Sequence, residues 1–144
     1  MNTFKTLTAV LLFSILFLSC NMAEGGVKFS NNMDKYALEY IQKNNLLNED
    51  EKIEAYYDYT VSMDGTEAAI LTNTRVIYHN AEAETSSIFI KDIIEVKHRE
   101  VSLIGDIIEM YTADGGSFVV EIAPLNNGEL FLNLLKMKVG AVEK

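Results

Sequence analysis

The stretch IEAYYDYTVS at residues 53–62 alternates in character along its whole length. One set of positions holds Ile53, Ala55, Tyr57, Tyr59 and Val61, and the set between them holds Glu54, Tyr56, Asp58, Thr60 and Ser62. A period of two over this length predicts a half-buried β-strand. Asp64-Gly65 is a strong signal for a hairpin turn, and residues 67–72 supply a returning strand. The stretch therefore predicts an antiparallel hairpin.

The sequence that follows repeats this pattern of short strands and turns. Asp114-Gly115-Gly116 marks a further tight turn, and Pro124 ends the last strand. The additional strands are predicted at residues 74–79, 85–90, 93–101, 107–112 and 117–123. Seven short strands joined by tight turns predict an antiparallel meander that bends into a sandwich or a partly open barrel.

A helix is predicted after the last strand. Asn126, with Glu129 three residues later, is a capping signal for its start. Apolar residues then cover a broad face of the helix, and Gly140 is expected to end it. The members of that face are Leu130, Phe131, Leu134, Leu135 and Met137.

A second helix is predicted before the strands. Its apolar residues recur at helical spacing, which places them on one face. Asn31 or Asn32 is expected to cap its start, and Asn44-Asn45 to end it. The residues of that face are Met33, Tyr36, Ala37, Tyr40 and Ile41.

Two stretches carry a resemblance to a known fold. Residues 69–78 (AILTNTRVIY) look like the second and third strands of bacterial pleckstrin-homology and GRAM-like domains, and residues 88–93 (IFIKDI) look like the fourth strand and the turn after it. The resemblance spans roughly residues 50–140 and implies a mainly β (α+β) fold, a seven-stranded antiparallel bent sandwich capped by the C-terminal helix. The alternative is another all-β sandwich with an unrelated terminal helix.

The N-terminus has the features of a secretory signal peptide. One positive charge, Lys5, precedes the uncharged residues 6–18, and Ser19 is small. Thirteen residues are too few to cross a bilayer, which takes roughly 20. Cys20, the one cysteine of the chain, follows directly and excludes an intrachain disulfide.

Residues 16–20 (LFLSC) resemble the cleavage box of bacterial lipoproteins, with Phe17 where leucine is usual. The resemblance implies cleavage between Ser19 and Cys20 and attachment of fatty acyl chains, palmitate among them, to Cys20. It also implies an extracytoplasmic position on the cell membrane or, with Asn21 after the cysteine, the outer membrane. A plain secretory peptide with an incidental cysteine, or an uncleaved anchor, remains the alternative.

These observations divide the chain into four parts. Residues 1–19 are the signal peptide, and residues 20–31 are a lipidated flexible tether. Residues 32–48 hold the N-terminal amphipathic helix and a linker, and residues 49–144 form the pleckstrin-homology-like domain.

The charge of the chain excludes two kinds of partner. The net charge is −9, and removal of residues 1–19 takes away one base and no acid, which leaves −10. Such acidity argues against nucleic acid and against electrostatic attraction to anionic lipid. The predicted first hairpin, residues 62–67, carries two acids and no base, so we expect no phosphoinositide to bind there.

Residues able to carry chemistry are few. His79 and His98 are predicted to be surface residues, and the acidic run at residues 48–51 to be solvated. No nucleophile elbow, phosphate loop or set of metal ligands is recognisable. We therefore predict no catalytic residue, no cofactor and no metal.

The predicted function is that of a non-catalytic protein-interaction module, held at the membrane of the cell envelope by acyl chains on Cys20. An immunity or inhibitor protein against an extracytoplasmic enzyme would be a special case. The alternative is a small-ligand binder or hydrolase whose site is assembled from dispersed residues. Its pocket would use the strand tyrosines Tyr56, Tyr57, Tyr59, Tyr78 and Tyr111.

Overall fold

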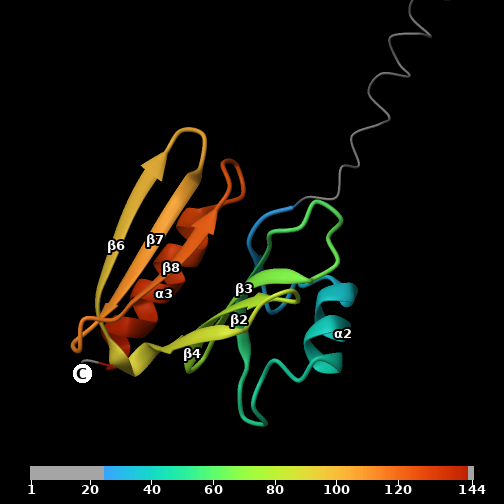
Figure 1. The fold of residues 1–144 in the computed structure, drawn as a ribbon, viewed down its shortest axis with the longest axis horizontal. Coiled ribbons are helices and arrows are strands. Elements are labelled where there is room, and N and C mark those ends of the chain that lie inside the picture. Colours follow the sequence, from blue (N-terminus) through green and yellow to red (C-terminus); the bar gives the residue numbers. More distant parts are fainter. Residues whose placement is uncertain (1–24, 143–144) are drawn as a thin grey trace, which may run out of the picture.

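The computed structural model describes residues 25–142, which form two antiparallel sheets and two α-helices (Figure 1). The first sheet has the strand order β1-β2-β3-β4-β5, and the second has the order β6-β7-β8. Strands of the first sheet are β1 (Lys28–Phe29), β2 (Ile53–Asp58), β3 (Glu67–Thr72), β4 (Arg75–Asn80) and β5 (Ser86–Phe89). The 3-10 turn η1 (Ile90–Asp92) leads to β6 (Ile93–Val101), β7 (Gly105–Thr112) and β8 (Ser117–Ile122).

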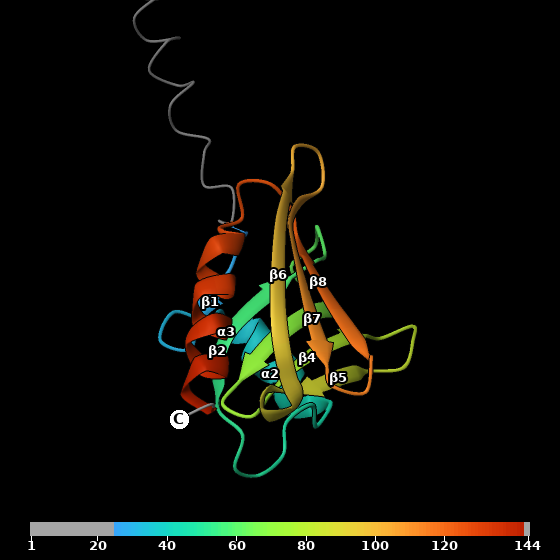
Figure 2. The same ribbon diagram turned by 90° about the vertical axis from the view of Figure 1, so that its left-hand side faces the viewer.

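Helix α3 (Gly128–Val142) covers the opening between the two sheets, and Figure 2 shows it lying alongside β6. Its residues Phe131 and Leu135 are fully buried and share one cluster with Leu71 of β3 and Ile108 of β7. Burial of side chains of this size contributes about 1.5–3 kcal/mol each, so this cluster is the main core. The prediction of a bent antiparallel sandwich capped by a C-terminal helix is confirmed.

Helix α2 (Lys35–Lys43) covers the other face of the first sheet. Ala37 and Ile41 pack with Tyr56 of β2 and Ile70 of β3 in a second apolar cluster. As a result β2 is buried on both faces, whereas its alternating sequence predicts burial on one. The helix explains the difference, since it hides the face that would otherwise meet water.

Local expectations for the tether and for both helices differ from the structure. Lys28 and Phe29, predicted to belong to the tether, form β1 and pair with β2. Helix α2 begins at Lys35 with Asp34 in the N-cap position, because Asn32 instead accepts a hydrogen bond from the amide of Phe29.

The C-terminal helix also differs, since α3 continues through Gly140 to Val142. A glycine within a helix costs about 1 kcal/mol relative to alanine, which need not end the helix. The predicted signal peptide at residues 1–19, with Ser19 and the acylated Cys20, lies outside the described residues. Within residues 25–142, no helix is both long enough and apolar enough to cross a bilayer.

Candidate functional site

A groove lies beside the C-terminal end of α3, with a volume of about 510 Å³. Three parts of the chain that are distant in sequence form it: the β3–β4 turn, the end of β5 with η1, and the last turn of α3. We call it the C-terminal groove, and its lining residues are Asn73, Thr74, Phe89, Ile90, Lys91, Lys138, Ala141 and Val142.

The chemistry of the C-terminal groove is apolar with a basic contribution. Phe89 and Val142 are 47% and 55% exposed, so both present apolar surface to solvent. The amine of Lys91 lies 5.6 Å from the centre of the Phe89 ring. Two lysines line the groove of a chain whose net charge is −9, and the second of them, Lys138, is paired with Glu54. The arrangement suits a segment that carries apolar and acidic side chains.

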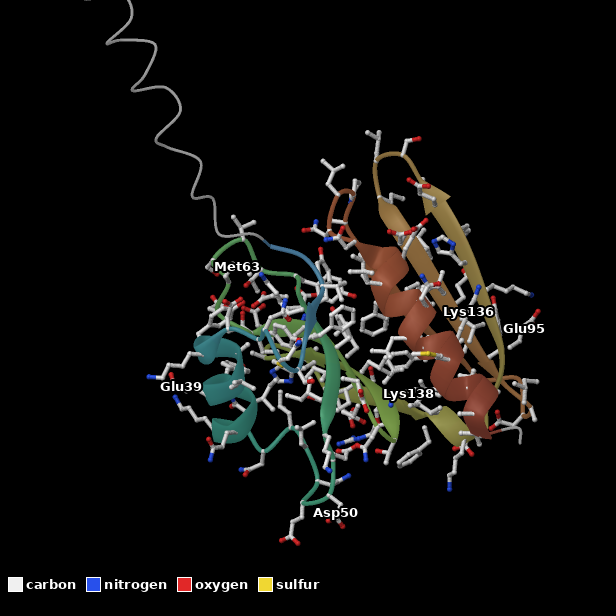
Figure 3. The ribbon with its side chains drawn as sticks, turned by 180° about the vertical axis from the view of Figure 1, so that it is seen from behind. Glu39, Asp50, Met63, Glu95, Lys136 and Lys138 are labelled. Carbon is white, nitrogen blue, oxygen red and sulfur yellow. The ribbon has the colours of Figure 1, made fainter. Side chains whose placement is uncertain are left out.

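Lys138 is held in place by a partly exposed ion pair between α3 and β2. Its Nζ lies 2.7 Å from a carboxylate oxygen of Glu54 on β2. Figure 3 shows Lys138 on the side of α3 that faces the first sheet and Lys136 on the side toward β6 and Glu95. The ion pair therefore fixes one wall of the C-terminal groove.

A second, smaller cavity of about 300 Å³ lies where β8 meets the first sheet. Tyr59, Tyr78 and Glu67 line it, and the hydroxyl of Tyr78 donates to the carboxylate of Glu67. The ring centres of Tyr57 and Tyr59 are 4.9 Å apart, and those of Tyr59 and Tyr78 are 5.7 Å apart.

The structure therefore brings together only some of the five tyrosines that the sequence suggested as a pocket. Tyr57, Tyr59 and Tyr78 come together, whereas Tyr56 belongs to the cluster under α2 and Tyr111 lies in the second sheet.

Tyr57 of β2 and Tyr59, which follows that strand, accept hydrogen bonds from the backbone at the edge of β8. The amide of Ala123 donates to the hydroxyl of Tyr57 at 3.2 Å, and the amide of Glu121 donates to the hydroxyl of Tyr59 at 3.3 Å. Backbone amides at a sheet edge need such acceptors. Burial raises the pKa of Tyr59, so its phenol stays protonated at neutral pH and is unsuited to act as a base.

Replacement of Tyr57 by phenylalanine is expected to lower the free energy of unfolding by about 1 kcal/mol, because the amide of Ala123 loses its acceptor. Urea denaturation measures the change. Tyr111→Phe is the control, since its hydroxyl bonds Glu109 on its own strand and does not join the sheets. Equal stability of the Tyr57 variant and the wild type would contradict this role.

Two polar residues predicted to face solvent are buried instead. His79 is 7% exposed, and its ring nitrogens lie 3.1 Å from the hydroxyl of Tyr40 and 2.8 Å from that of Thr85. Burial lowers the pKa of His79, which keeps the ring neutral near pH 7.

Glu51, from the acidic run, is the second of these residues. It forms two hydrogen bonds of 2.8 Å with the guanidinium of Arg75, and its side chain is 3% exposed. Hydrogen bonds from Arg75 lower the pKa of Glu51 to about 2. The side chains of His79 and Glu51 are thus hydrogen-bonded to other residues of the domain, and their role is structural.

The remaining candidates for chemistry do not form a site. The Nε2 atom of His98 lies 2.7 Å from a carboxylate oxygen of Asp106, which joins β6 to β7. Within residues 25–142, no group of three or more His, Cys, Asp or Glu side chains could hold a metal ion.

The C-terminal groove was not predicted from the sequence. One signal for it was present: Ile88, Phe89 and Ile90 are consecutive apolar residues, although a strand with one buried face needs only alternate ones. The structure buries Ile88 and Ile90 and leaves Phe89 exposed beside Lys91.

The two sheets and the capping helix define the class of the protein as one with a pleckstrin-homology-like fold. A crystal structure of a DUF1696 family protein with a pleckstrin-homology domain from Shewanella loihica PV-4 is similar to this chain, with a TM-score of 0.55 and 12% sequence identity. The match covers 75% of this chain and 99% of the other. No family model matches the sequence, and no curated protein matches it.

Proposed function

We propose that the protein is a lipid-anchored, non-catalytic interaction module whose C-terminal groove binds a segment of another protein of the cell envelope. The observation that carries the proposal is the groove itself, an apolar hollow with two lysines on the surface of an acidic domain. A partner segment with apolar and acidic side chains would gain apolar burial from Phe89 and Val142 and charge complementarity from Lys91.

The residues around the groove support a binding role over a catalytic one, and they carry this distinction because a fold alone does not assign chemistry. His79 and Glu51 are bonded inside the domain and do not line the groove, and the carboxylate of Glu54 beside it is paired with Lys138.

The anchor is the second part of the proposal. The resemblance of residues 16–20 to a lipoprotein cleavage box supports acylation of Cys20. One acyl chain binds a membrane only marginally, whereas two hold a protein stably. A module anchored in this way would meet its partners at the membrane of the envelope.

A photoreactive benzoylphenylalanine at position 89 is expected to crosslink the full-length protein to one discrete partner in its native membranes. The matched control carries the same group at Val119, which is 43% exposed on β8 near the tyrosines. Lys91→Glu should reduce the crosslinked product roughly tenfold, since loss of one ion pair and the added repulsion amount to about 1.4 kcal/mol.

Three results would count against the groove as a protein-binding site. They are no crosslink at position 89, the same products at positions 89 and 119, and a yield unchanged by Lys91→Glu. A small-molecule adduct on the probe at position 89 would instead support the ligand-binding alternative.

A further inference from the structure

Bulky apolar side chains stand exposed at one end of the sandwich, on the tips of three separate loops. Val61 in the β2–β3 loop is 104% exposed, Leu103 in the β6–β7 turn is 93% exposed, and Leu125 in the β8–α3 loop is 101% exposed. Figures 1 and 2 show all three loops at the upper end of the molecule. Single exposed apolar residues are common, but a group of them at one end marks a contact surface.

The backbone at two of these loops is unfavourable for the residues that occupy it. Leu125 has φ 68° and Met63 has φ 53°, both in the left-handed region that bulky side chains avoid. Asparagine or glycine would suit these positions better, and a fully exposed leucine adds nothing to the core. Residues with strained backbones cluster at functional surfaces.

The β2–β3 loop is also held in a fixed shape. The carboxylate of Asp58, 6% exposed, accepts hydrogen bonds from the amide of Thr60 at 2.8 Å and the amide of Gly65 at 2.9 Å. The hydroxyls of Tyr36 and Tyr56 donate to the same carboxylate. The loop therefore presents its tip, which includes the labelled Met63 in Figure 3, as a preformed surface.

The start of the described chain lies at this same end. The amide of Val27 donates to the carbonyl of Asn126 at 3.0 Å, which places the segment after Gly25 against the β8–α3 loop. Cys20 precedes Gly25 by five residues, and a chain of that length reaches at most roughly 17 Å. An anchor at Cys20 would keep the three loop tips close to the bilayer.

We propose that these loop tips insert into the interfacial region of the bilayer that carries the acyl chains. This inference rests on the proposed anchor at Cys20. The contact is made by the apolar side chains at the tips, while the exposed carboxylate of Asp64, which accepts from Ser62 at 2.6 Å, would stay among the polar headgroups.

The contact also orients the domain. Helix α3 begins beside the loop tips and ends at the C-terminal groove, and its 15 residues span about 22 Å. With the tips in the bilayer, the groove faces away from the membrane and is accessible to a partner.

Tryptophan fluorescence tests the contact directly, because the chain contains no tryptophan. The full-length acylated protein is reconstituted into phosphatidylcholine vesicles with brominated acyl chains, carrying Val61→Trp, Leu103→Trp or the control Phe89→Trp. Phe89 is 47% exposed and lies at the opposite end, in the C-terminal groove. For Val61→Trp and Leu103→Trp, we expect the emission to shift to shorter wavelength and to be quenched by the brominated chains. For the control Phe89→Trp, we expect neither change.

Mass spectrometry of Cys20 and flotation of the vesicles accompany each measurement. An acylated, vesicle-bound chain in which the three tryptophans behave alike overturns the loop contact and leaves the anchor intact. An unacylated chain that does not float overturns the anchor and the loop contact together. A spectral shift at positions 61 and 103 that requires added envelope proteins would identify the tips as a protein-binding surface and overturn the proposal.

Discussion

Replacement of Cys20 by serine is expected to move the protein from the membrane fraction to the soluble fraction of the envelope. A serine hydroxyl lacks the thiolate nucleophile that the acyl transfer needs. Each buried methylene contributes about 0.8 kcal/mol, so the loss of two chains removes far more binding than any surface contact supplies. The remaining chain, at a net charge of −10 without residues 1–19, has no electrostatic attraction to anionic lipid.

Fractionation with an intact-mass measurement checks this result, and Ser19→Ala is the matched control. Alanine is also small, so that variant should still be processed, acylated and recovered with membranes. A Cys20→Ser protein that stays in the membrane fraction without residues 1–19 would show that acylation is not the anchor. If it stays there with residues 1–19 retained, the segment acts as an uncleaved anchor instead.

The strands were the most predictable part of the fold. The predicted bounds of residues 67–72 and 93–101 coincide with β3 and β6. Turn residues and a period of two are local properties, so they place the strands correctly even though β2 and β3 are buried on both faces. The capping helix was also predictable from a local property, because all the residues of its broad apolar face lie within 15 consecutive positions.

Contacts between distant segments were not predictable in this way. Strand β1 has only two residues, too few for any period, and forms because Lys28 meets Tyr56 in β2. His79 ends a predicted strand and was expected at the surface, and its burial follows from Tyr40, which α2 brings over the sheet. The C-terminal groove likewise forms only where three distant segments of the chain meet, so no single stretch of sequence predicts it.

Replacement of Arg75 by methionine is expected to lower the free energy of unfolding by about 3 kcal/mol, because it leaves the carboxylate of Glu51 buried without its cation. Urea denaturation at pH 7 measures the loss. Lys35→Met is the matched control. Lys35 also pairs with a glutamate, Glu39, at 3.2 Å, but the two side chains are 89% and 64% exposed. An exposed pair contributes about 0–1 kcal/mol, so the control should change little.

The pH dependence of stability tests the same ion pair independently. Hydrogen bonds from Arg75 lower the pKa of Glu51 from its ordinary 4.5 to about 2 in the folded chain. Since the folded state favours the ionised form, this stabilisation is complete above about pH 4.5 and is lost as the pH falls toward 2. The difference between a pKa of 4.5 and one of about 2 corresponds to about 3 kcal/mol, the same size as the expected effect of Arg75→Met at pH 7.

The gap in stability between the wild type and Arg75→Met should therefore narrow as the pH falls from 5 toward 2.5. Carboxylates outside this pair titrate in both proteins and cancel in the difference. Asp64, whose pKa is lowered by hydrogen bonds from Ser62 and Thr66, is one of these. Within the ion pair, Glu51 is the group that titrates over this range. A difference in stability that stays constant would therefore mean that methionine destabilises the protein through lost packing around the arginine stem.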